Sequence, residues 1–179
     1  MSCVLYLASD KALPERPNPH ERMLSVREAI AADVKDIPDF LLTGGVDLDK
    51  PGVILVSDRE VRFDAENGTI TDGDFDDDFA VWPVEKSVGM RTEKRYCATL
   101  EWNRYTPGRA GMLIEYLRER LAETDEIEMW NCWLDDEPIH RICRAVIPIG
   151  ELTAEDIAEL DNQLVSKSPL TDYCFCIKG

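Results

Sequence analysis

Residues 127–134 read Ile-Glu-Met-Trp-Asn-Cys-Trp-Leu, and this stretch decides the fold. Apolar and aromatic side chains fall on both alternating faces of the segment, as is typical of a central strand covered on two sides. The following Asp-Asp-Glu-Pro at 135–138 predicts a turn. Residues 142–149 then predict a second strand that lies next to the first.

Helices are expected on either side of this pair of strands. Thr106 followed by Pro107 combines a side-chain cap with proline at the first helical position, so a helix begins there. Thr153 with two acidic residues after it begins another. Apolar residues at steps of three and four over 23–37 predict a third, which Pro38 ends. The expected core positions are Ala110, Leu113, Ile114, Leu117, Leu121, Ile157, Leu160 and Leu164.

Short apolar or alternating runs predict the remaining strands, and Asn67-Gly68 predicts a tight hairpin turn. Because strands outnumber helices and do not alternate with them regularly, the fold class is α+β, with a mixed or largely antiparallel sheet and two to three helices. A chain of 179 residues fits a single globular domain, 1–179. The predicted strands are 4–8, 53–56, 61–64, 69–71, 79–82, 96–102 and 173–177.

The net charge of -16 makes nucleic acid and anionic membranes unfavourable partners, because both would repel an acidic surface. Solubility is the simplest reason for this acidity. Residues 1–10 lack a basic leader and a small-residue cleavage site, so we expect no signal peptide and a soluble, cytoplasmic protein. Its six cysteines are then expected to be reduced.

Two groups of residues resemble metal ligands. Cys174 and Cys176 lie two apart on a predicted strand and therefore face the same side, while Cys132, His140 and Cys143 lie on segments that could be adjacent. Structural zinc sites usually hold their ligand pairs on tight turns, and free cysteine is commonly a buried apolar residue. We therefore expect these thiols to pack in the core, with no metal and no cofactor.

The acidic run 72–78 carries aspartates at alternating positions, as the start of an EF-hand loop does. Its sixth position is Asp77 where glycine is required, and its twelfth is Pro83 where glutamate is required. The run is therefore interpreted as a charged loop.

No catalytic residue is assigned, because the chain lacks a phosphate-binding loop, a nucleophile elbow and a zinc-protease helix. A ligand pocket could be lined by aromatic residues and nearby polar groups, for which the candidates are Tyr6, Ser9, Trp130, Asn131, Trp133 and Glu137. The resulting hypothesis is a binding or interaction module without catalytic activity, whose ligand is a protein partner or a small molecule. The oligomeric state is left open.

Two alternatives remain. A small hydrolase could use carboxylates such as Asp135, Asp136 or Glu137, since acidic pairs have no reliable spacing in sequence. An acidic protein could also imitate nucleic acid and inhibit a DNA-binding protein, which would require a ladder of carboxylates.

Three fragments resemble stretches of small bacterial proteins of unknown function that open with a Cys-x-Leu-Tyr-Leu-Ala-Ser strand. They are residues 3–9, 113–117 and 128–133. In those proteins a glycine- and cysteine-rich turn precedes the middle helix, whereas this chain has Glu-Lys-Ser-Val-Gly-Met at 85–90. The resemblance implies a shared fold, and it indicates no particular activity or mechanism.

Overall fold

The computed structural model describes residues 3–58, 62–64, 69–71, 75–86, 90–133, 141–166 and 171–179. The chain divides into two compact units, residues 1–18 with 74–179, and residues 19–73. The prediction of a single domain remains a prediction.

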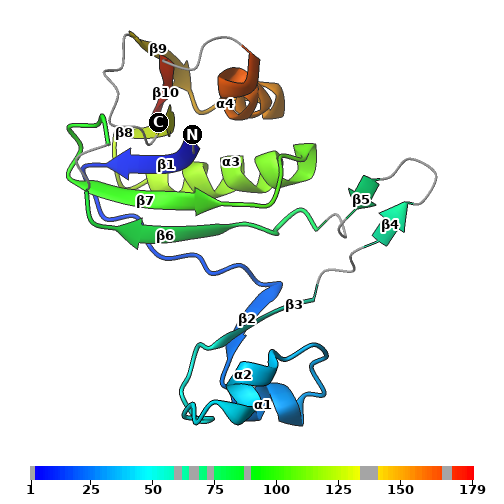
Figure 1. The fold of residues 1–179 in the computed structure, drawn as a ribbon. Coiled ribbons are helices and arrows are strands. Elements are labelled where there is room, and N and C mark those ends of the chain that lie inside the picture. Colours follow the sequence, from blue (N-terminus) through cyan, green and yellow to red (C-terminus); the bar gives the residue numbers. More distant parts are fainter. Residues whose placement is uncertain are drawn as a thin grey trace. The chain divides into compact units, whose positions relative to one another are not determined.

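The larger unit is built on one six-stranded sheet (Figure 1). All neighbouring strands are antiparallel except β10 and β9, which run parallel. The sheet is therefore mixed and the predicted α+β class is confirmed. In spatial order the strands are β6 (Ala80–Val84), β7 (Tyr96–Glu101), β1 (Cys3–Ser9), β8 (Glu126–Trp133), β10 (Thr171–Lys178) and β9 (Arg141–Pro148).

The prediction for residues 127–134 is confirmed, because β8 lies between β1 and β10 in the middle of the sheet. The prediction that residues 142–149 pair with this strand is wrong. They form β9, which pairs with β10, and β10 occupies the place beside β8. Parallel neighbouring strands need a long crossover connection, and α4 provides it between β9 and β10. A direct hairpin from β8 to β9 would not need such a connection.

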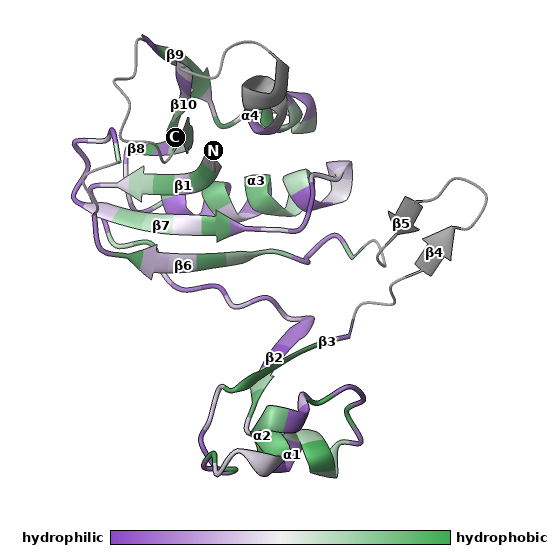
Figure 2. Ribbon diagram, in the orientation of Figure 1, coloured by the Kyte–Doolittle hydropathy of each residue, from purple (hydrophilic) through white to green (hydrophobic). Residues whose placement is uncertain are grey.

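One face of the sheet, here named the helix face, is covered by α3 (Pro107–Leu121) and α4 (Ala154–Ser166). Figure 1 shows α3 behind β1 and β7, and Figure 2 shows hydrophobic and hydrophilic stretches alternating along it. The five predicted core positions of α3 are all buried, as are Ile157 and Leu160 of α4. The side chain of Leu164 lies outside the described residues.

The start of α3 is confirmed in detail. The Thr106 hydroxyl accepts a hydrogen bond from the backbone N–H of Arg109 at 3.1 Å, and Pro107 occupies the first helical position. Burial of one apolar face against the sheet then stabilises the helix.

The smaller unit contains a pair of antiparallel strands, β2 (Glu21–Leu24) and β3 (Ile54–Ser57), and two short helices. The helices are α1 (Val26–Ala31) and α2 (Asp39–Thr43). A predicted hairpin is also present as β4 (Arg62–Asp64) and β5 (Thr69–Thr71), with Phe63 opposite Ile70. Its Asn67-Gly68 turn lies outside the described residues.

The prediction of one helix over 23–37 is wrong, since Met23 belongs to β2 and α1 is only six residues long. Ser25 starts α1 through a capping box, in which its hydroxyl accepts from the Glu28 N–H and its own N–H donates to the Glu28 carboxylate. Asp33 and Asp36 have φ of 54° and 61°, left-handed values that end helical geometry. The described chain therefore has four helices where two to three were predicted.

In the part of the chain that the structure describes, no helix combines the length and apolar character needed to cross a membrane.

Candidate functional site

The face of the sheet opposite the helices carries a cluster that mixes aromatic rings, thiols and charged groups. Residues 90–94, which belong to the connection from β6 to β7 and are here named the strap, cross this face. We therefore name it the strap face. Two sets of residues belong to it. The apolar part comprises Tyr6, Ala8, Cys97, Trp130, Cys132, Cys174 and Cys176. The buried polar part comprises Thr92, Glu128 and Asp172.

Two hydrogen bonds and one ion pair connect the strap to three neighbouring strands. The backbone N–H of Arg91 donates to the Tyr6 hydroxyl on β1 at 3.0 Å, and the Thr92 hydroxyl donates to Glu128 Oε2 on β8 at 2.5 Å. The Arg91 guanidinium also lies 3.5 Å from the Asp172 carboxylate on β10. Since these contacts come from positions adjacent in sequence, the strap is held across the sheet and covers its polar groups.

Two of the predicted pocket residues meet here. The rings of Tyr6 and Trp130 are stacked, with centroids 5.9 Å apart and planes at 8°, and both residues have no exposed surface. Burial raises the pKa of the Tyr6 hydroxyl far above its ordinary value, with the Cys132 sulfur adding to the effect. The pair therefore forms part of a core.

The other pocket candidates do not join them. Ser9 is buried at the end of β1, where its hydroxyl accepts from the Lys11 N–H and donates to Thr124 Oγ1 at 3.4 Å, so it stabilises a turn. Asn131 lies on the helix face and its amide donates to Leu160 O of α4 at 2.8 Å. The side chain of Trp133 and the whole of Glu137 lie outside the described residues, as do Asp135 and Asp136.

The prediction that Cys174 and Cys176 face one side is confirmed, and their sulfurs are 3.9 Å apart. Both are buried. Burial, the neighbouring Cys176 and the Glu128 carboxylate all raise the pKa of the Cys174 thiol, so this thiol is protonated at neutral pH. Cys132 shares the strap face, and burial raises the pKa of its thiol to about 12. Cys143 is opposite Tyr173 and faces the helix side, while His140 lies outside the described residues.

Glu128 is the site residue that sequence reasoning missed. It lies opposite Cys176 on the neighbouring strand, and its carboxylate oxygen and the two sulfurs all lie within 4.8 Å of one another. Three donors hold this buried carboxylate: the Thr92 hydroxyl, the Trp130 indole N–H at 2.7 Å and the Arg144 guanidinium at 3.1 Å. A charged residue inside an apolar strand was the available signal, but strand register was needed to place it.

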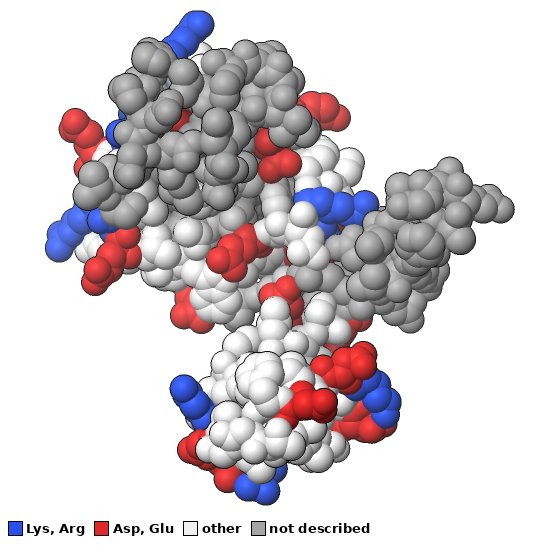
Figure 3. All heavy atoms as spheres, viewed as in Figure 1, with Lys and Arg blue, Asp and Glu red and all other residues white. Residues whose placement is uncertain are grey.

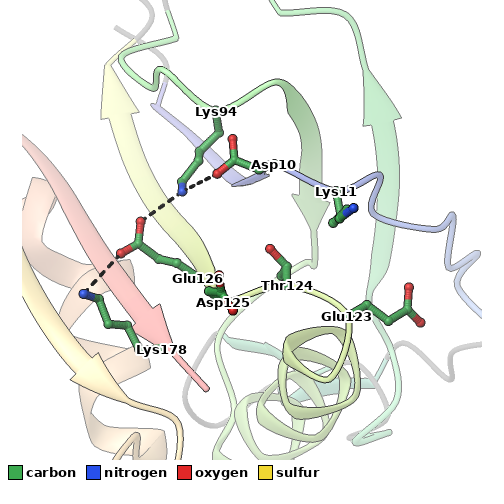
Figure 4. A pocket seen from close by; sticks show the side chains of 8 residues that line it. All are labelled: Asp10, Lys11, Lys94, Glu123, Thr124, Asp125, Glu126 and Lys178. Carbon is green, nitrogen blue, oxygen red and sulfur yellow. Dashed lines mark hydrogen bonds and ion pairs between the residues drawn. The ribbon is translucent and has the colours of Figure 1, made fainter.

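A pocket of about 430 Å³ opens where the strap face meets the ends of β1, β8 and β10 (Figure 4). Figure 4 shows Lys94 between Asp10 and Glu126, with nitrogen–oxygen distances of 2.7 and 3.2 Å, and Lys178 on the other side of Glu126. Glu126 lies two residues before Glu128, and Lys178 two residues after Cys176. The polar pocket therefore borders the group formed by the Glu128 carboxylate and the Cys174 and Cys176 thiols.

The acidic run also has a structural role. Asp78 is completely buried and accepts from the Arg109 guanidinium at 2.7 Å and from the Asn18 amide at 2.6 Å. The prediction of a solvated charged loop over residues 72–78 is therefore wrong for Asp78. Asp72 and Asp74 lie outside the described residues. On the face drawn in Figure 3, the described Asp and Glu side chains form separate groups and not one continuous ladder.

The last notable surface is the outer edge of β9. Within the described chain this eight-residue strand pairs with β10 alone. On the strap side it presents Ile142 and Val146, which are 43% and 63% exposed, with Arg144 between them. Residues 141–148 contain two arginines and no acidic residue, although the chain as a whole is strongly acidic.

Comparison with known proteins gives no match to a family model, to a curated protein or to a solved structure.

Proposed function

We propose that the protein is an interaction module without catalytic activity, and that it takes an extended segment of a protein partner along the outer edge of β9. The observation that carries this proposal is the row of Ile142, Arg144 and Val146 on a strand that, among the described residues, is paired on one side only.

The backbone supplies the first part of the recognition. In a paired strand every second residue directs its N–H and C=O away from the neighbour, so the outer edge of β9 offers main-chain donors and acceptors to another strand. Addition of a partner strand to such an edge is a common mode of peptide binding. At eight residues β9 is long enough for several main-chain hydrogen bonds.

The side chains supply the selectivity. Residues directly opposite each other on paired strands contact one another, so the partner should place apolar side chains opposite Ile142 and Val146. A carboxylate opposite Arg144 would share the guanidinium with Glu128. A second copy of β9 fits poorly. If it paired antiparallel with Ile142 opposite Val146, it would place Arg144 opposite Arg144, and like charges in that position repel.

The chemistry of the strap face supports binding over catalysis. The thiolate is the reactive form of cysteine, and the buried Cys132 and Cys174 keep their protons because burial raises both pKa values. Glu128 is engaged by three donors.

The test uses two synthetic peptides, Thr-Val-Thr-Glu-Thr-Val-Thr and the same peptide with lysine for glutamate. Titration of isotope-labelled protein followed by NMR should shift the amides of residues 141–148 with the glutamate peptide. The lysine peptide should bind about two- to thirtyfold more weakly, since a cross-strand charge pair contributes about 0.2 to 1 kcal/mol and its reversal costs a similar amount.

Val146→Asp should abolish the shifts. Met112→Asp is the matched control, because Met112 is an exposed apolar residue on α3 and its replacement should leave binding unchanged. Equal binding of both peptides, or shifts outside β9 and its neighbour β10, would refute the proposal.

A further inference from the structure

The geometry points to a second binding site: we propose that Cys174, Cys176 and Glu128 bind one zinc ion. The three ligands lie on β8 and β10 beneath the strap, and Arg144 of β9 is a residue that this site shares with the proposed peptide-binding edge.

The distances fit tetrahedral zinc. Zinc–sulfur bonds of about 2.3 Å meeting at a tetrahedral angle put two sulfurs about 3.8 Å apart, and the Cys174 and Cys176 sulfurs are 3.9 Å apart. A carboxylate oxygen at about 2.1 Å from zinc would lie about 3.6 Å from each sulfur. The observed limit of 4.8 Å for the Glu128 oxygen therefore requires only a small side-chain movement.

The charges also balance. Without the ion, the Glu128 carboxylate is offset by the Arg144 guanidinium at 3.1 Å. With Zn²⁺, two thiolates and the carboxylate leave a net charge of about minus one on the metal and its ligands, which Arg144 again offsets. Binding breaks two S–H bonds, forms two Zn–S bonds and releases two protons to solvent, without oxidation or reduction.

The surroundings of Glu128 resemble the support that metal ligands receive. The Thr92 hydroxyl and the Trp130 indole N–H both donate to Oε2 and fix the orientation of the carboxylate. Two thiolates with one carboxylate select zinc over calcium or magnesium, which prefer oxygen ligands. A water molecule would complete the tetrahedron.

The ion has a route to the site. Glu128 and Cys176 keep 5% and 7% of their surface exposed. The pocket of Figure 4 adjoins them through Glu126 and Lys178, the next residues of the same face on β8 and β10.

The inference revises the expectation that the thiols only pack. Spacing along one strand could not show a third ligand, because Glu128 is brought to Cys176 by the register of β8 with β10.

The experiment titrates Zn²⁺ into the reduced, metal-free protein and measures stoichiometry and released protons. We expect one zinc and two protons per chain, with thiolate absorption in the near ultraviolet when Co²⁺ replaces zinc. A wild-type protein that binds no zinc, or that binds it without releasing protons, would overturn the inference. All of these measurements are made on the wild-type protein.

Variants locate the site. Cys176→Ser and Glu128→Gln should weaken zinc binding at least tenfold, and Cys174→Ser likewise. Cys132→Ser is the matched control, because Cys132 is a buried thiol of the same face whose sulfur contacts the Tyr6 hydroxyl and is not one of the three proposed ligands. Retention of full affinity in the double variant of Cys174 and Cys176, or its loss in Cys132→Ser alone, would also overturn the assignment.

Discussion

Arg109 and Asp78 form an ion pair at 2.7 Å in which neither side chain has any exposed surface. The guanidinium also donates to the backbone oxygens of Phe75 and Arg104, at 3.2 and 3.0 Å. The pair therefore joins the first turn of α3 to the residues that lead into β6.

Replacement of one member should be costly. Arg109→Met would leave the Asp78 carboxylate buried without its cation, and such changes typically destabilise by about 3 to 5 kcal/mol. Urea unfolding should show this loss. Arg118→Met is the control, because Arg118 pairs with Glu115 on the exposed side of α3 and should change the midpoint little. A similar small effect of both variants would contradict the structural role of the buried pair.

The change in stability on replacing a glycine of α3 by alanine should depend on the position of the glycine. An added methyl group at Gly111 meets no atom within 4 Å, so Gly111→Ala should stabilise by about 0.5 to 1 kcal/mol. At Gly108 the same carbon would lie 1.7 Å from Asp76 Oδ1, and the carboxylate must move. Gly108→Ala should therefore raise the free energy of unfolding by less than Gly111→Ala does. Urea midpoints of the two variants give the order, and the reverse order would be inconsistent with this packing.

All six cysteines should be free when the protein, purified without reductant, is titrated with Ellman's reagent in denaturant. Five of them are free and described in the structure. In the native protein Cys143 should react faster than the buried Cys97, Cys132, Cys174 and Cys176, so Cys143→Ser should remove a fast phase. Detection of only four thiols would reveal a disulfide and would contradict the expected cytoplasmic location.

Alkaline pH should destabilise the fold. Burial, followed by the charge of Asp172, raises the pKa of the Cys132 thiol from 9.0 to about 12. A group whose pKa is raised by folding contributes fully below its unfolded pKa and loses that contribution as pH rises toward the folded value. The window is therefore about pH 9 to 12, with a loss of about 1 kcal/mol at pH 10 from this thiol.

Cys132→Ala isolates this effect. Its free energy of unfolding, measured in urea at pH 8 and pH 10, should fall less between the two values than that of the wild type. An equal fall in both proteins would show that other groups govern the alkaline transition.

Local signals in the sequence were sufficient for many of the elements. The cap at Thr106 with Pro107 predicted α3, and the two-sided apolar pattern predicted β8, because both depend on interactions between near neighbours. The helix predicted over 23–37 failed because periodicity alone does not reveal left-handed residues such as Asp33 and Asp36.

Long-range placement could not be predicted from the sequence. The position of β10 between β8 and β9 depends on pairing across the whole sheet, and the contact of Glu128 with Cys176 follows only from that register. Tyr6 and Trp130 were predicted as aromatic pocket candidates, but their rings stack on each other and both are fully buried, which composition could not show.

The position of β1 inside the sheet has a consequence for biosynthesis. Tyr6 pairs with Thr99 and with Trp130, so neither neighbour exists when β1 is made. At roughly 5 to 20 residues per second, the ribosome needs several seconds to supply them. During that interval a newly made apolar segment has no strand to pair with, and it is the part of the nascent chain that a chaperone would be expected to bind.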